Sequence, residues 1–404
     1  MYLRLSWRNL WRDKKRTVIA ACSVFFAVLL AVVMRSGQTG SYAYMIDSSA
    51  SMYMGYLQIQ GDDYWENRSL DKSIVLSQTT TDSLEQVPNL TSVTPRLEAF
   101  ALVAREANTK VAQVVGIDPA REDAMTRLRK RLVEGVYLTG GSGGVMVGQG
   151  LAEILGLAIG DSVVIYGQGY HGQTAAARLP VDGIVKLPFP AMNNSMLYLT
   201  LSNAQEIFSA YGRITSAAVM TDNVAHLAAV TAGVRSVVGD KYTIMTWDEM
   251  MPDLVQGIEL DNVSGIVMLL ILYIVIAFGV FGTVMMMTSE RAREFGILVS
   301  LGMNKARLVL VTTLETIQIS FLGAVAGFLG SLPLIHYLHN NPIHMTGDAA
   351  KAYESFGIEP IMNFSTNPHL FVTQSLVVLA IALAAALYPV LFISRLQPAK
   401  AIHG

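Results

Sequence analysis

Four long apolar runs alternate with polar stretches along the chain. They cover residues 17–34, 263–288, 308–336 and 370–394. Each run is long enough to cross about 30 Å of hydrocarbon as a helix that rises about 1.5 Å per residue. The pattern therefore predicts four transmembrane helices, with the longest polar stretch, 35–262, between the first and the second.

The stretch 35–262 shows the short alternating and helical patterns of a folded α+β domain. Helical stalks are expected at its ends, over 36–54 and 248–262. The subdomain boundaries are expected at about 55–120 and 213–247 for an outer β-α-β part, and at about 121–212 for an inserted β-rich part. Thr246-Trp-Asp-Glu249 is a capping box, which predicts a helix that continues without a break into the second span. The predicted fold class is membrane α-helical, with four transmembrane helices and a large α+β extracytoplasmic domain inserted between helices 1 and 2.

The segment 1–16 carries tryptophans and arginines at helical spacing. Trp7, Leu10 and Trp11 share one face and arginines lie between them, which predicts an amphipathic helix in the inner headgroup layer, against anionic membrane lipid. A cleaved signal peptide is the alternative, because it also begins with positive charge before an apolar stretch. An amphipathic helix precedes the apolar stretch here and no small-x-small cleavage site follows it, so we favour an uncleaved span.

Charge is distributed unevenly, although the net charge is only −2. The segments 1–16, 289–307 and 395–404 together carry 12 Lys and Arg against 3 Asp and Glu, whereas 35–262 carries 16 against 24. Short basic segments beside membrane spans stay in the cytoplasm. Both termini and 289–307 are therefore expected in the cytoplasm, with the large domain and the loop 337–369 on the other side.

The segment 289–307 between the second and third spans is short, charged and compatible with a helix, with Ser289 as the expected N-cap. Phe295, Leu298 and Gly302 recur at helical spacing, and they form part of an apolar stripe that no other segment of this chain is expected to cover. Such a helix, held outside the membrane by two spans, is suited to bind a soluble partner. An ordinary cytoplasmic loop with one helical turn is the alternative.

Glu290-Arg-x-Arg-Glu-Phe-Gly-Ile-Leu, followed by Ser-Leu-Gly-Met and by Glu315, resembles the FtsX/MacB-type (type VII) ABC transporter permeases. The phrase Val-Gly-x-Gly-Leu-Ala-x-x-Leu-Gly-Leu-x-x-Gly-Asp over 147–161 is similar to the extracytoplasmic domain of the same family. The resemblance implies that 289–307 contains the coupling helix that docks on an ATPase. The residues that it assigns to coupling are Glu290, Arg291, Arg293, Glu294, Phe295, Gly296, Leu298, Leu301 and Gly302.

The layout is most similar to the lipoprotein-releasing, LolC/LolE-like branch of that family, because the length is 404 residues and no Walker motif is present. The resemblance implies a bacterial inner-membrane permease subunit that acts by mechanotransmission and is not itself catalytic. It implies that ATP and Mg are bound by a cytoplasmic ABC ATPase dimer on partner chains, and that this chain binds no cofactor. Four helices are few for a closed pathway, so a second permease, identical or paralogous, is expected.

The implied substrate is a lipoprotein or another lipid-linked molecule, which is lifted out of the inner membrane. Two other functions stay open: export of a peptide or small molecule with a periplasmic adaptor, as in MacB-like proteins, and signalling to a cell-wall hydrolase, as in FtsX-like proteins. An independent enzyme is not expected, because no Ser/His/Asp, Cys/His or paired-carboxylate arrangement stands out. No nucleic-acid partner is expected either, since the basic run Arg127–Arg131 is typical of a solvated surface.

Further candidate sites lie outside the coupling segment. Candidates for contact with the acyl chains of a substrate are the outer-half residues of the second span, Val263, Val267, Leu270 and Ile274. Packing in a dimer or against lipid is the alternative for them. The loop 167–174, with Tyr170 and His171 at its tip, is the candidate docking site for a soluble carrier, although it lacks the proline-rich character expected there. Gly323 and Gly327 allow close helix packing, within the subunit or with a second one.

Glu315 lies inside the third span, where an acidic group costs about 2.5–3.5 kcal/mol on insertion scales. We expect it to face a structural partner, such as an arginine of the coupling region or of the N-terminal helix. A side chain that extends to the interface and a proton-relay role are the alternatives. His336, His339 and His344 lie close in sequence, but no cysteine or correctly spaced carboxylate accompanies them, so no metal site is expected. The single cysteine, Cys22, excludes an internal disulfide.

Overall fold

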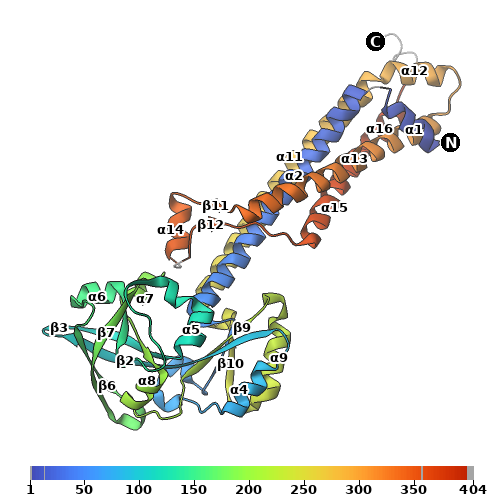
Figure 1. The fold of residues 1–404 in the computed structure, drawn as a ribbon. Helices are drawn as coiled ribbons and strands as arrows, with labels where there is room; N and C mark the ends of the chain where they lie inside the picture. The colour runs from blue at the N-terminus through green and yellow to red at the C-terminus, as the bar shows by residue number, and fades with distance from the viewer. Residues whose placement is uncertain (1, 13, 356–357, 398–404) are drawn as a thin grey trace. The chain divides into compact units, whose positions relative to one another are not determined.

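The structure is a computed structural model that describes residues 2–12, 14–355 and 358–397, and the chain forms two compact units (Figure 1). The membrane unit comprises Met1–Ala43, Gly257–Met345 and Ile361–Gly404. The outer unit comprises Tyr44–Gln256 and Thr346–Pro360. From the sequence, the last of these segments was expected in a separate loop, because nothing in its local pattern shows that it packs with a domain a hundred residues earlier.

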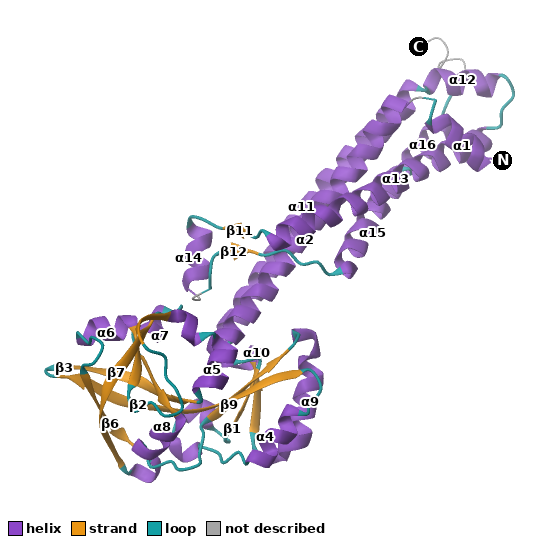
Figure 2. Ribbon diagram, in the orientation of Figure 1, coloured by secondary structure: helices purple, strands orange, loops and turns teal. Residues whose placement is uncertain are grey.

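The membrane unit is built from helices, apart from a short two-stranded ladder (Figure 2). The helices are α1 (Tyr2–Leu10), α2 (Lys14–Ser49), α11 (Pro252–Glu290), α12 (Ala292–Ser300), α13 (Lys305–Asn340), α15 (Pro368–Ala385) and α16 (Leu387–Ser394). The ladder pairs β11 (Ile343–His344) with β12 (Ile361–Met362).

Four candidate spans are long and apolar enough to cross a membrane in the described part of the chain, which confirms the four predicted transmembrane segments. The fourth is interrupted at Ala386, between α15 and α16. Pro389 explains the interruption, since it has no N–H to donate to the carbonyl of Ala385 and its ring would clash there.

The spans differ in how far this chain covers them. The most apolar window of α11 is 11% buried, against 39%, 44% and 33% for the windows in the other three spans. By contrast, α13 packs so closely on α2 that a Cβ at Gly323 would lie 2.7 Å from the Cβ of Val24, and one at Gly327 would lie 2.8 Å from the Cβ of Val28. These two glycines therefore serve packing within the subunit.

The outer unit contains one ten-stranded mixed sheet with the strand order β10-β1-β9-β2-β3-β8-β5-β7-β4, and β6 pairs with both β2 and β7. The strands are β1 (Leu57–Gln60), β2 (Leu90–Arg105), β3 (Asn108–Ile117), β4 (Leu132–Gly135), β5 (Val145–Gly148), β6 (Ser162–Gln168), β7 (Thr174–Val185), β8 (Met196–Thr200), β9 (Ser216–Thr221) and β10 (Thr243–Thr246). The α-helices are α3 (Tyr64–Asn67), α4 (Gln78–Glu85), α5 (Pro119–Thr126), α6 (Gln149–Leu155), α7 (Pro190–Asn193), α8 (Leu201–Ile207), α9 (Leu227–Val238), α10 (Trp247–Met250) and α14 (Asp348–Ser355).

Two long strands join the parts that the sequence pattern separates. The first half of β2 pairs with β9, but its second half pairs with β6, and β3 pairs in parallel with β8. One apolar core packs α4 and α9 on β1 and β9, and a second packs α6 and α8 on β3, β5 and β6. The two halves of β2 thus belong to different parts of the sheet, and the boundary between the two subdomains lies within this strand.

The connection into the second span is not one continuous helix. The predicted capping box is present, with Glu249 accepting a hydrogen bond from the backbone N–H of Thr246. The helix that it starts, α10, ends at Met250, and Met251 has non-helical angles (φ −126°, ψ 60°) before α11 begins at Pro252. The expectation of an unbroken helix was wrong because a residue that precedes proline is driven out of the helical region.

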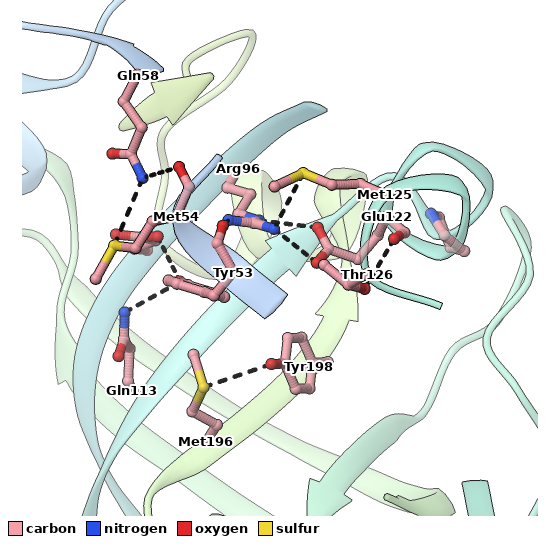
Figure 3. Close-up of polar contacts among 12 residues, drawn as sticks. Tyr53, Met54, Gln58, Arg96, Gln113, Glu122, Met125, Thr126, Met196 and Tyr198 are labelled. Atoms are coloured by element: carbon pink, nitrogen blue, oxygen red, sulfur yellow. Dashed lines mark hydrogen bonds and ion pairs between the residues drawn. The ribbon is translucent and has the colours of Figure 1, made fainter. Parts of the chain in front are cut away.

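A buried polar cluster fixes the end of the first long helix to the sheet of the outer unit (Figure 3). After α2 the chain makes a π-helical turn over Ala50–Met54. Arg96 of β2 donates to the backbone oxygen of Tyr53 in this turn, and it forms two bonds of 2.8 and 2.7 Å to the carboxylate of Glu122 in α5. The Tyr53 hydroxyl donates to Glu98, whose other oxygen accepts from Tyr64 at 3.0 Å.

Candidate functional site

The predicted coupling segment forms a short helix, α12, that begins later than expected. α11 continues through Ser289 to Glu290, so Ser289 is not an N-cap, and Arg291 (φ −95°, ψ 5°) takes that place instead. α12 ends in a tight turn in which Gly302 adopts φ +93°, a value that favours glycine. The N–H of Met303 donates to the oxygen of Leu298 at 3.0 Å and closes this turn.

Phe295 is covered by its own chain. Its side chain is 1% exposed and packs with Leu308 of α13 and with Ile393 and Leu396 at the C-terminal end of the fourth span. Gly296 beside it is also buried. The expectation that Phe295 belongs to an uncovered stripe was therefore wrong, because α16 supplies the cover.

The face of α12 that remains open is made by other apolar residues. Ile297 is 43% exposed, Leu298 is 38% exposed, and Leu301 is 80% exposed at the start of the closing turn. The exposed side chain of Arg293 lies in the first turn of the same helix. An apolar surface of this kind on a basic cytoplasmic-type segment is what a soluble partner can bind.

Glu315 is held between three elements at the base of this helix. Its carboxylate accepts a 2.7 Å hydrogen bond from Nδ2 of Asn9 in α1, and its second oxygen pairs with Nη1 of Arg291. Arg291 also approaches Glu294, Nε to Oε2, at 3.4 Å. The acidic side chain that the sequence placed inside the third span is thus 7% exposed and engaged by groups of the same unit.

Two further ion pairs connect the start of the chain to the coupling segment. Arg12 approaches Glu294 at 2.8 Å, and Arg16 approaches Glu290 at 2.9 Å. Both pairs are largely exposed, so each adds little stability by itself. Together with the contacts of Glu315, these pairs connect α1 and the beginning of α2 to the end of α11 and to α12.

A cavity of about 40 Å³ lies beside Glu315 and Arg291, lined also by Thr283, Thr312 and Ser320. That volume has room for a few water molecules at most. The cavity is too small for a lipid-linked molecule, and the contacts of Glu315 and Arg291 beside it hold the base of α12 in place.

The candidate substrate-contact residues share one open stripe of α11. They are all about half exposed or more: Val263, Val267, Leu270 and Ile274.

The candidate carrier loop, 167–174, differs between its two tip residues. Tyr170 is half-buried, with the Arg213 guanidinium 4.4 Å from the centre of its ring, whereas His171 is exposed and its backbone N–H donates to Asp71 at 2.8 Å.

An exposed apolar row lies on the sheet next to this loop, and the sequence reasoning missed it. Leu102 of β2 is paired with Val111 of β3 on one side and with Tyr166 of β6 on the other, and all three are exposed. Phe100 extends the row along β2. Exposed and buried positions alternate over Phe100–Val103, but all four residues are apolar, so the sequence does not show which face is open.

The histidines of the third span have separate partners. His339 contacts the backbone oxygen of Phe364 at 2.7 Å, and His336 contacts Asn340 at 3.2 Å. In the described ranges, no group of three or more His, Cys, Asp or Glu side chains could hold a metal ion.

Comparison with known proteins agrees with this architecture. The MacB-like periplasmic core domain family matches residues 17–237, more than half of the chain, and the FtsX-like permease C-terminal family matches residues 266–398. The chain therefore belongs to the FtsX/MacB-type family of ABC transporter permeases, whose members are generally non-catalytic, work with ABC ATPases and often pair with a second permease.

Several proteins of that family are similar to the chain. The chain is 24% identical over 333 residues to the lipoprotein-releasing system transmembrane protein LolC of Xylella fastidiosa, covering 78% of each chain. It is 22% identical to LolE of Haemophilus influenzae, covering 80% of this chain and 79% of that one. The periplasmic region of MacB from Actinobacillus actinomycetemcomitans is 20% identical with a TM-score of 0.36, covering 50% of this chain and 91% of that one.

Proposed function

We propose that this chain is the permease subunit of an inner-membrane complex that couples ATP hydrolysis on a separate ATPase to the release of lipoprotein, or of another lipid-linked molecule, from the membrane. The observation that carries the proposal is the open apolar face of α12, braced from within by Phe295 and Glu315. The similarity to LolC and LolE supports lipoprotein as the substrate class.

The ATPase docks, in this proposal, on Ile297, Leu298 and Leu301. ATP and Mg are bound by that partner, and this chain contributes the helix that moves when the ATPase dimer closes. The brace at the base of α12 matters because a helix that moved freely would absorb the displacement instead of passing it to α11 and α13. The termini and α12 lie on the cytoplasmic side, and the outer unit lies in the periplasm.

A second permease, identical or paralogous, covers part of α11. This span is the least covered of the four. Its exposed apolar residues run from Leu260 to Met286, along most of the length of α11. In the proposal, the outer half of this stripe, from Val263 to Ile274, faces the acyl chains of the substrate between two permeases. A soluble carrier docks at His171 and on the exposed row beside it.

The test replaces the exposed leucines of α12 together. Leu298→Ala with Leu301→Ala should weaken association with the ATPase by roughly thirtyfold, since apolar anchors at an interface centre are commonly worth about 2 kcal/mol. The matched control is Leu310→Ala with Leu391→Ala, two leucines that are also exposed but lie on α13 and α16. The measurements are co-purification of the ATPase, stimulated ATP hydrolysis, and release of lipoprotein from proteoliposomes.

Phe295→Ala is not an equivalent test. Truncating a buried phenylalanine costs about 3–5 kcal/mol in a packed core, so it would loosen α12 itself. Wild-type association in the Leu298, Leu301 variant would show that the ATPase binds elsewhere. ATP hydrolysis that is coupled to peptide export, with no lipoprotein released by the unmodified complex, would favour the MacB-like alternative.

A further inference from the structure

The outer unit contains a cleft of about 1120 Å³ that the proposed function does not use. Its walls come from the end of α2, the C-terminal end of α5, the segment between β7 and α7, and the segment before β12. Three cationic side chains line it, from Arg127, Arg131 and Lys186.

Backbone geometry holds two of these cations next to each other. The N–H of Lys186 donates to the oxygen of Arg131 at 2.9 Å, where the chain enters the antiparallel pair of β4 and β7. Arg127 stands at the end of α5 in a left-handed conformation (φ 54°, ψ 38°), which starts the turn that leads to Arg131. Like charges carried by residues that are neighbours through a backbone hydrogen bond repel each other.

Among the described residues, no carboxylate is paired with these three cations. Within the described ranges, the side chains of Arg127, Arg131 and Lys186 make no hydrogen bond or ion pair. Burial lowers the pKa of Arg131, and the group that acts against this is the phenol of Tyr198. The cleft also contains two acidic residues, but Asp47 accepts a hydrogen bond from Tyr56 at 2.6 Å and Glu359 pairs with none of the three cations.

Part of the remaining wall is flexible or apolar, and Ser48, Ser51 and Thr126 add neutral polar groups. Met52, Met125 and Met220 contribute to the wall, together with Pro188 and Pro190. Methionine adapts to irregular partners and is over-used at surfaces that bind different peptides. The volume is at or above the upper end of the range for small-molecule sites, about 300–1,000 Å³, and so exceeds what a single small anion needs.

We propose that this cleft binds an acidic polypeptide segment, whose carboxylates pair with Arg131 and Lys186 and whose apolar side chains contact the methionines. Arg127 contacts the same segment at the other end of the turn. The proposal does not depend on lipoprotein being the substrate, because the segment can belong to any polypeptide that reaches the outer unit.

The test measures peptide binding to the full-length protein in nanodiscs of uncharged lipid. The probe is a short fluorescein-labelled peptide rich in glutamate, read by fluorescence anisotropy. Arg131→Gln with Lys186→Gln should weaken binding by about tenfold or more, the equivalent of about 1.4 kcal/mol. These changes remove charges that have no partner among the described residues, so the fold should stay intact, which is checked by thermal unfolding.

The matched control comes from the same basic run. Arg129→Gln with Lys130→Gln removes the same charge, but these residues do not line the cleft, and binding should change by less than about twofold, the scale of an exposed charge. Equal loss in the two double variants would overturn the proposal. So would equal binding of a peptide with lysine in place of glutamate, or displacement of the probe by inorganic phosphate but not by chloride of equal ionic strength.

Discussion

Two arginine–glutamate pairs, one in each unit, differ in what surrounds them. In the outer unit, the side chains of Arg96 and Glu122 are 0% and 1% exposed (Figure 3). In the membrane unit, Arg291 and Glu315 are 17% and 7% exposed. The chemistry of the two pairs is the same, but the first is enclosed and the second borders a small cavity and an open helix.

The outer pair is a closed arrangement. Both carboxylate oxygens of Glu122 accept from Arg96, and the third contact of the guanidinium goes to the backbone of Tyr53. Burial lowers the pKa of Arg96, but the charge and hydrogen bonds of Glu122, together with Tyr53 and Glu98, outweigh it, so the pKa lies above the ordinary range. Such a pair holds the end of α2 against β2 in a single geometry.

The membrane pair is branched. Arg291 reaches Glu315 and Glu294, and Glu294 is shared with Arg12. Each charge therefore has a second partner when one contact opens. The comparison indicates that the pair in the outer unit is held in one geometry, whereas α12 sits on contacts that can be exchanged while it stays attached.

The largest effect is expected from opening the outer pair. Arg96→Met leaves the carboxylate of Glu122 buried without its partner, and breaking a buried pair in this way costs about 3–5 kcal/mol. The expected result is a lower unfolding temperature and faster proteolysis of the outer unit in the full-length protein. Thermal unfolding and limited proteolysis in nanodiscs measure it.

The control for that prediction replaces both members of the pair. Arg96→Met with Glu122→Leu removes both charges, so most of the stability should return, with a remaining cost of about 1 kcal/mol for the hydrogen bond lost at Tyr53. If the double variant is as unstable as Arg96→Met alone, the pair is not the source of the effect.

A smaller effect is expected at the branched pair. Glu315→Gln keeps an oxygen for Asn9, and Arg291 keeps Glu294, so the variant should lose about 1 kcal/mol or less. Glu315→Leu leaves both donors without this acceptor and should cost more, about 1–3 kcal/mol, and it should also reduce the ATPase activity stimulated by the permease. Complete loss of activity in both variants, with the complex intact, would instead indicate a protonation role.

Much of this arrangement follows from local sequence pattern. The four spans were predictable because length and hydropathy report directly on membrane insertion, and the interruption at Met251 could have been read from Pro252. The short helix between the second and third spans was predictable because its residues are contiguous. Each of these features depends on residues that are close together in the sequence.

The remaining features depend on residues that are far apart in the sequence. Nothing near Phe295 indicates that Ile393 covers it, and nothing in the alternating pattern of β2 shows that Arg96 points inward to Glu122. A charged residue in a strand normally indicates an exposed face, so a buried pair looks like two surface residues until the fold brings them together. The segment Thr346–Pro360 was missed for the same reason.

The smallest effect is expected at an exposed pair, which sets the baseline for the comparison. In the outer unit, the His226 ring lies 2.9 Å from Oδ1 of Asp222, and both side chains are nearly half exposed. The hydrogen bond from His226 lowers the pKa of Asp222 below its ordinary value of 3.8. The stabilisation is therefore present above that value and is lost as the pH falls through the lowered pKa.

His226→Gln should accordingly be slightly less stable than the wild-type protein at neutral pH, and the difference should shrink below the ordinary pKa of the aspartate. Urea unfolding of both proteins at neutral and at acidic pH measures their free energies of unfolding. Taking the difference between the two proteins removes the pH dependence of the carboxylates that they share. Because water screens this pair, the effect should be far smaller than that of Arg96→Met. A comparable loss at the two sites would mean that enclosure is not what separates the pairs. The contrast between the enclosed pair of the outer unit and the exchangeable contacts of α12 would then lose its physical basis.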